Sequence, residues 1–184
     1  HIDCGILGTK YVMHALTEHG RADVAFRIAT QTTYPSWGHW IAQGATTLWE
    51  SWDGINSRNH IMFGDVGAWF YKALAGINPD PEHPGFKHTI IRPQPVGDLR
   101  WASAEHHSMY GTIRSSWKKE HGRFTLRVEI PVNTDATVHI PATGPETVQE
   151  SDRLASKAEG VRFLRVEDGH CVYAVDSGKY SFTV

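Results

Sequence analysis

The sequence predicts an α+β chain in two parts, with helices over residues 1–79 and an antiparallel β-sandwich over residues 80–184. Apolar residues recur at helical spacing before residue 80, and their period falls to two after the breaker-rich segment INPDPEHPG. The chain has 184 residues, of which 40% are hydrophobic and 21% charged. That composition is typical of an ordinary globular protein with room for one sizeable domain or two small ones.

Four helical segments are expected in the first part. The first follows Thr9, a possible cap, and ends at Gly20, and the second covers residues 22–31, so the two form an antiparallel hairpin. A short third segment covers residues 35–44. The last, residues 60–75, is apolar on nearly every side, and we therefore expect other helices to surround it.

In the second part, apolar and polar residues alternate as they do in half-buried strands. Residues 113–117 and 124–130 alternate on either side of a KKEHGR turn, which predicts a hairpin. Later segments of the same kind are separated by turn residues. Many short strands at this spacing are typical of an antiparallel sandwich. The further strands are expected around residues 138–140, 161–166, 171–175 and 180–184.

Charge and hydropathy limit the partners. The formal net charge is -2 and Lys and Arg are scattered, so neither nucleic acid nor a membrane surface is expected as a partner. No apolar run is long enough to span a bilayer, and no signal peptide opens the chain. Because the first residue is His1 rather than Met, we interpret the chain as a piece of a longer polypeptide.

Cysteine and histidine give no sign of a metal centre. Cys4 and Cys171 lie at opposite ends of the chain, and two buried thiols are the simpler expectation over a disulfide. The twelve histidines include no HExxH motif, and the adjacent His106 and His107 would point to opposite faces of a strand. We therefore predict no metal ion and no cofactor.

The segment GATTLWESWDG, residues 44–54, places two indoles beside two carboxylates. Tryptophan favours burial, whereas Asp and Glu lose free energy on burial unless they are paired. The segment therefore predicts a wall that is half apolar and half reactive, formed by Trp49, Glu50, Trp52 and Asp53. Such a wall suits a polar ligand with one apolar face, and a sugar is such a ligand.

Three runs in the helical part resemble the α-L-rhamnosidases of glycoside hydrolase family 78. They are GTKYVMHALTEHGRADVAFRI, TYPSWGHWIAQGATTLWESWDG and NHIMFGDVGAWFYKALAGI, and PGFKHTIIRPQP follows them. The resemblance covers most of residues 5–93 and thins beyond them. It implies the last helices of an (α/α)6 barrel, or six-hairpin glycosidase domain, followed by the family's C-terminal β-sandwich. It also implies a rhamnose-containing glycoside as substrate.

The resemblance further implies roles for two residues. Glu50 matches the general base of an inverting hydrolysis, and His60 matches a sugar-contacting histidine. Family members carry the general acid on an upstream acidic motif that this chain does not contain. The upstream remainder of the same polypeptide is therefore the implied partner, and the chain alone is expected to be inactive.

The neighbouring residues leave alternatives open. Inversion needs a second carboxylate on the opposite side of a cleft, so Asp53 is interpreted as a hydroxyl-binding or supporting group, or simply as a turn residue before Gly54. Trp49 and Trp52 either line a sugar subsite or belong to the core. Two other functions fit the same sequence, namely a carbohydrate-binding sandwich with supporting helices, and a different (α/α)6 hydrolase or lyase.

Overall fold

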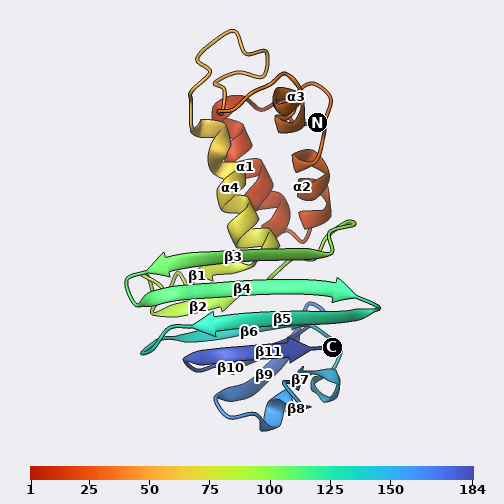
Figure 1. Ribbon diagram of the computed structural model, residues 1–184, viewed down its shortest axis with the longest axis vertical. Helices are drawn as coiled ribbons and strands as arrows, with labels where there is room; N and C mark the ends of the chain where they lie inside the picture. Colours follow the sequence, from red (N-terminus) through yellow and green to blue (C-terminus); the bar gives the residue numbers. More distant parts are fainter. The chain divides into compact units, whose positions relative to one another are not determined.

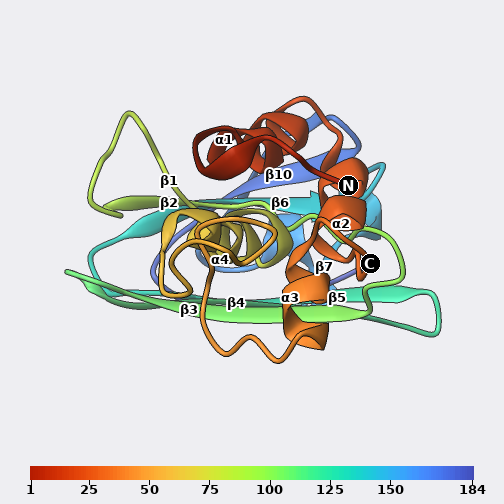
Figure 2. The ribbon, with the colours of Figure 1, turned by 90° about the horizontal axis from the view of Figure 1, so that it is seen from above.

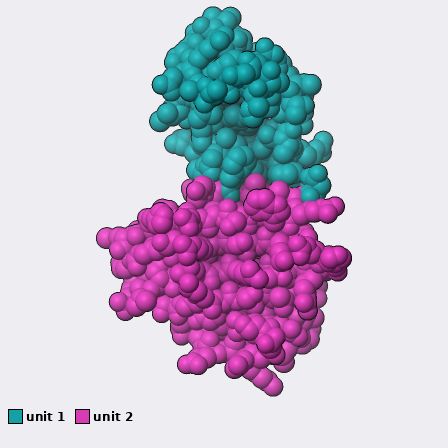
Figure 3. Space-filling view, in the orientation of Figure 1, with its two compact units in different colours: residues 1–70, 96–98 teal, residues 71–95, 99–184 magenta.

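The computed structural model describes residues 1–184, which divide into two compact units. The first unit comprises residues 1–70 and 96–98, and the second comprises residues 71–95 and 99–184 (Figure 3). The first unit is helical and the second consists of two β-sheets, so the predicted fold class is confirmed. The domain boundary expected from the sequence, after residue 79, stays a prediction.

The first helix of the first unit lies beside the second and the last (Figure 1), and polar contacts between side chains join the first to the last. The His14 imidazole Nε2 on the first helix lies 2.8 Å from Asp65 Oδ2 on the last. One turn further along, Trp69 Nε1 donates to Thr17 Oγ1 at 2.8 Å.

None of the helices has the length and apolar character that a membrane span requires. The elements are α1 (Gly5–Glu18), α2 (Ala22–Ala29), α3 (Trp37–Ala42), η1 (Met62–Gly64) and α4 (Asp65–Trp69).

Three local predictions about this part are corrected. Thr9 does not cap α1, because its hydroxyl lies inside the helix and donates to the Gly5 carbonyl at 2.7 Å. This back-bonding to the preceding turn is an alternative to capping that threonine often takes. Cys4 is exposed rather than buried, whereas Cys171 is buried, and both are free thiols. The last helical run begins at Met62, two residues later than predicted.

The second unit stacks its two sheets as layers, which Figure 2 shows edge on. The π-helix η2 (Phe70–Leu74) leads into it. Every strand pair is antiparallel except β2 with β6, which is parallel. The five-stranded sheet has the order β1 (Ile77–Pro79), β2 (His88–Ile91), β6 (Asp135–Pro141), β10 (His170–Val175) and β9 (Val161–Glu167). The six-stranded sheet has the order β3 (Trp101–Ser108), β4 (Gly111–Glu120), β5 (Arg123–Ile130), β11 (Gly178–Thr183), β7 (Gln149–Glu150) and β8 (Arg153–Leu154).

The predicted hairpin is the pair β4–β5, with Trp117 opposite Leu126. Both side chains are buried between the sheets, where Tyr173 and Phe182 also lie. Side chains on the alternate positions of these strands face away from this core. Two short turns, η3 (Pro145–Thr147) and η4 (Ala155–Lys157), complete the unit. The sandwich therefore has one apolar interior and a polar outer face on each sheet.

The segment before β1 is tied into the sandwich core by two buried hydrogen bonds. Trp117 Nε1 donates to the Leu74 carbonyl at 2.6 Å, and Ser115 Oγ donates to the Ala75 carbonyl at 2.6 Å. Gly76 follows at φ +82°, and a Cβ there would lie 2.2 Å from the Pro93 nitrogen. Only glycine fits this close approach of two backbone segments.

These bonds predict that residues 71–184 form a more stable unit than residues 80–184. The shorter piece lacks β1 and both acceptor carbonyls, so Trp117 Nε1 and Ser115 Oγ are left buried without partners. Each such group costs about 1–3 kcal/mol. We expect residues 71–184 to give a cooperative thermal transition at a clearly higher temperature, measured by near-UV circular dichroism.

Trp117→Phe provides the control for this comparison. In residues 71–184 it removes both ring volume and the bond to Leu74, whereas in residues 80–184 it removes only volume. The substitution should therefore cost more free energy of unfolding in the longer piece. Equal costs in the two pieces would show that the bond to Leu74 contributes nothing.

A buried histidine sits on β6 of the five-stranded sheet. His139 is 5% exposed, and its Nδ1 has no hydrogen-bond partner. Burial, together with the nearby positive charges of Arg92, His170 and Arg165, lowers the pKa of His139 to about 4 against the opposing charge of Glu167. The imidazole is therefore neutral in the folded protein at physiological pH.

The depressed pKa of His139 predicts acid sensitivity of the second unit. In the unfolded chain this imidazole takes up a proton below about pH 6.5, whereas in the folded state it does so only near pH 4. The unfolded state therefore binds more protons in that window, and the free energy of unfolding should fall by roughly 3 kcal/mol as pH drops through it. Urea unfolding at pH 7, 5.5 and 4.5 measures this. His139→Gln should flatten the dependence, whereas His107→Gln, at an exposed histidine, should leave it intact.

Candidate functional site

Residues 44–61 form a loop between α3 and η1, and the loop folds back on itself as a short two-stranded ladder. The Glu50 N–H donates to the Ser57 carbonyl at 2.8 Å, and the His60 N–H donates to the Leu48 carbonyl at 2.8 Å. These backbone bonds bring Glu50 and His60, ten positions apart in sequence, onto neighbouring arms of one loop.

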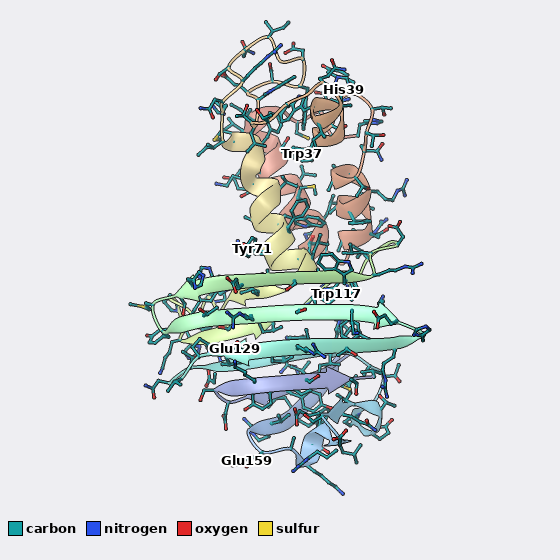
Figure 4. The ribbon with its side chains drawn as sticks, in the orientation of Figure 1. Trp37, His39, Tyr71, Trp117, Glu129 and Glu159 are labelled. Atoms are coloured by element: carbon teal, nitrogen blue, oxygen red, sulfur yellow. The ribbon has the colours of Figure 1, made fainter.

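The loop rests on an aromatic cluster made of four indoles and one phenyl ring. The ring centroids of Trp40 and Trp52 are 4.6 Å apart, and those of Trp52 and Phe63 are 4.2 Å apart. Trp40 Nε1 also donates to the Trp52 carbonyl at 2.9 Å. Figure 4 labels Trp37, which lies on α3 and donates to the Phe63 carbonyl at 3.1 Å. The members of this tryptophan cluster are Trp37, Trp40, Trp49, Trp52 and Phe63.

The two tryptophans predicted as site residues are buried members of this cluster. Trp49 is 6% exposed and Trp52 is 5% exposed, which leaves only an edge of each ring for a ligand. The Arg58 guanidinium covers the Trp49 ring at 4.7 Å from its centroid. Trp52 Nε1 is buried without a hydrogen-bond partner. Their main structural effect is to support the loop, and sugar contact by either ring stays a prediction.

Glu50 is half-buried on the first arm of the loop. Its Oε2 accepts a hydrogen bond from the Ser57 N–H at 3.2 Å, and its Oε1 accepts none from the protein. The carboxylate is therefore oriented by the opposite arm while one oxygen stays free to accept a proton. A positioned carboxylate of this kind is what a general base requires.

Asp53 holds the turn at the tip of the loop. Its Oδ1 accepts hydrogen bonds from Ser51 Oγ at 2.6 Å and from the Ile55 N–H at 3.1 Å. The bond from Ser51, followed by the bond from the Ile55 N–H, lowers the pKa of the exposed Asp53 carboxyl. This is the geometry of an Asx turn. The other carboxylate oxygen remains available to solvent or to a ligand hydroxyl.

His60 lines a hollow of about 420 Å³ at the base of the two arms. The Met62 N–H donates to His60 Nδ1 at 3.4 Å, which leaves Nε2 without a hydrogen-bond partner in the protein. The wall contains two hydroxyls and an amide that sequence reasoning did not single out, on Thr46, Thr47 and Asn59. Glu50 does not line this hollow. No three His, Cys, Asp or Glu side chains are grouped to hold a metal ion.

The packing of the loop on the tryptophan cluster can be tested at Gly54, which lies at the tip of the loop. Its φ is +68°, and a Cβ would lie 2.5 Å from the Trp49 ring, whereas Gly44 has φ +81° with open space around it. Gly54→Ala therefore adds a collision to backbone strain, and Gly44→Ala adds strain alone, on the order of 1 kcal/mol. We expect Gly54→Ala to lower the unfolding temperature more and to alter the near-UV circular dichroism of the tryptophans. Equal effects of the two substitutions would contradict the close packing of the tip.

Two family models match successive parts of the chain, up to residue 155. The bacterial α-L-rhamnosidase six-hairpin glycosidase domain matches residues 1–74. The bacterial α-L-rhamnosidase C-terminal domain matches residues 76–155. Among curated proteins, an α-L-rhamnosidase of Streptomyces avermitilis is 40% identical over 100% of the chain, and one of Formosa agariphila is 32% identical over 99%. The chain spans only 18% and 21% of the length of these two relatives.

Solved structures give the same result. The crystal structure of the Streptomyces avermitilis α-L-rhamnosidase complexed with L-rhamnose superposes with a TM-score of 0.88 at 39% identity, over 98% of this chain and 18% of that one. The α-L-rhamnosidase from Dictyoglumus thermophilum superposes with a TM-score of 0.89 at 40% identity, over 100% of this chain and 21% of that one. These matches in sequence and in fold establish that the chain belongs to the α-L-rhamnosidase family.

Proposed function

We propose that the protein containing this chain is an inverting glycoside hydrolase that removes terminal α-L-rhamnose, with Glu50 as its general base. The position of Glu50 carries this proposal. Its carboxylate is oriented by the Ser57 N–H, keeps one oxygen free, and lies on a loop that the tryptophan cluster supports. Membership of the α-L-rhamnosidase family supplies the substrate class.

The proposed reaction needs two carboxyl groups, one on each side of the sugar. Glu50 removes a proton from a water molecule, whose oxygen attacks the anomeric carbon as the bond to the leaving oxygen breaks. A carboxylic acid on the opposite side gives its proton to that leaving oxygen. Asp53 lies on the same loop as Glu50 and is engaged in a turn, which favours an acid supplied by the remainder of the polypeptide.

The other predicted site residues take binding roles in this proposal. His60 Nε2 donates to a sugar hydroxyl in the hollow that it lines, while its Nδ1 is held by the Met62 N–H. Asp53 accepts from a sugar hydroxyl through its unengaged oxygen. Trp49 and Trp52 present ring edges to the sugar and keep the loop in place.

The surface of the first unit supports a larger catalytic domain around this loop. Apolar side chains that a stable monomer would bury lie in water here, and exposed apolar patches mark surfaces that another element covers. We infer that the remaining helices of the barrel cover them. The exposed side chains are Leu7, Tyr11, Ile41, Ile55 and Ile61.

Glu50→Gln in the whole enzyme tests the proposal. Glutamine keeps the acceptor for the Ser57 N–H but cannot take a proton, so kcat on an aryl α-L-rhamnoside should fall by about 10²- to 10⁴-fold while binding of L-rhamnose persists. Proton NMR of the first product formed by the unmodified enzyme should show inverted anomeric configuration. Retention would contradict the assignment of Glu50 as a base in a single displacement.

Two controls accompany this test. Glu18→Gln makes the same change at an exposed carboxylate on α1 and should leave kcat unchanged. Residues 1–184 alone should release no rhamnose, because the base lacks its acid. Turnover by the isolated chain, with contamination excluded, would contradict the division of the two carboxyl groups between this chain and the remainder.

A further inference from the structure

The outer face of the six-stranded sheet carries an ordered array of polar side chains. Residues opposite each other in antiparallel strands point to the same face. One row runs across β3, β4, β5 and β11, and the next row lies two positions along each strand. The first row consists of Trp101, Lys118, Thr125 and Thr183, and the second of Ser103, Ser116, Arg127 and Ser181.

This face is hollowed. A depression of about 520 Å³ lies over β4, β5 and β11 and is lined by side chains of both rows, with Arg123 at one end. Its lining includes the hydroxyls of Thr125, Ser181 and Thr183, each of which can donate and accept hydrogen bonds. The lining also contains three cationic side chains, Lys118, Arg123 and Arg127, against the single carboxylate of Glu120.

The two arginines in this depression have no acidic partner. Glu120, which faces Arg123 across the strands, is instead held by Lys118 at 2.8 Å. Arg127 lies between Ser116 and Ser181 and forms no ion pair. Arg123 and Arg127 are four positions apart on one strand, which separates them by roughly 13 Å. Two free guanidinium groups at this spacing fit two successive charges of an extended anion better than one small ion.

In the neighbouring row of the same sheet, by contrast, the arginine is paired with acids. Arg114 lies between two glutamates there, 3.0 Å from Glu105 and 2.6 Å from Glu129, and Lys179 also contacts Glu129. Arg114 thus has an acid on each neighbouring strand, whereas Arg127 has Ser116 and Ser181 on its neighbouring strands. The positive charge of Arg127 is therefore left uncompensated, although the sheet geometry allows its neutralisation.

An exposed indole adjoins the depression. Trp101 is 67% exposed on the edge strand β3 and lies opposite Lys118. A tryptophan offers a flat apolar surface on which the C–H face of a sugar ring can stack, with polar groups at its edge. Hydroxyls, free arginines and an exposed indole together fit a ligand that has apolar ring faces, many hydroxyls and repeated negative charge.

We propose that Trp101, Lys118, Arg123, Thr125, Arg127, Ser181 and Thr183 form a second, non-catalytic binding surface for an acidic polysaccharide. A sugar ring stacks on Trp101, and Arg123 and Arg127 each bind a carboxylate or sulfate through paired N–H groups. All of these residues belong to the second unit, whereas Glu50 and His60 belong to the first. The proposal therefore does not rest on the hydrolysis assigned to Glu50.

Affinity electrophoresis of the full-length protein tests this surface. Gels containing polygalacturonate offer carboxylates, gels containing dextran sulfate offer sulfates, and gels containing dextran offer neither. We expect retardation by at least one of the two acidic polymers and none by dextran. Arg127→Gln and Trp101→Ala should each weaken the retardation about tenfold, because each removes a principal contact. The ratio of the retardation in the two acidic gels identifies the preferred anion.

Arg162→Gln is the matched control, since Arg162 is an exposed arginine without an ion pair on β9 of the other sheet. It should leave retardation unchanged. Equal weakening by Arg162→Gln, equal competition by single-stranded DNA, or no retardation by either acidic polymer would overturn the proposal. Turnover of a neutral aryl rhamnoside should be the same in all these variants, so a failure of this surface is distinguishable from a failure of the catalytic assignment.

Discussion

The tryptophan cluster is the constraint on which the candidate site depends. Residues 44–61 contain no helix or strand, and a loop of this length has a large conformational entropy to lose. Burial of Trp49 and Trp52 against Trp40 and Phe63 offsets part of that loss, at roughly 1.5–3 kcal/mol for each large apolar side chain. The backbone ladder then sets which residues of the two arms meet, and so orients Glu50.

The same packing explains why acids and indoles alternate at the tip. Each indole points inward, and the residue after it, Glu50 or Asp53, points outward to the polar side of the loop. The free Nε1 of Trp52 costs about 1–3 kcal/mol of desolvation. Buried donors without partners are uncommon in stable cores, and they occur more readily where the structure serves a site. The aromatic cluster thus stabilises a loop whose polar groups contribute little to stability themselves.

Large apolar residues decided how much of the fold the sequence could predict. The β4–β5 hairpin was predictable because Trp117, Leu126 and their neighbours alternate strictly. Strand β3 was not, because its inward positions hold no large apolar residue and so give no apolar period; they are Ala102, Ala104, His106 and Ser108. In the site, Glu50 and His60 could be named from the family resemblance. Their placement on facing arms could not, because it rests on backbone hydrogen bonds that no side-chain pattern encodes.

The two polar surfaces differ in what their charges do for the fold. Exposed ion pairs such as those of Arg114 add little to stability, so leaving Arg123 and Arg127 without partners costs the sandwich little. Stability therefore gives no reason for one row of the sheet to be neutralised and the next to stay cationic. The sandwich core beneath is the same continuous apolar layer under both rows. The difference lies entirely in the outward side chains, which can vary without disturbing that core, and this independence makes a sheet face suitable for a binding surface separate from the loop that carries Glu50.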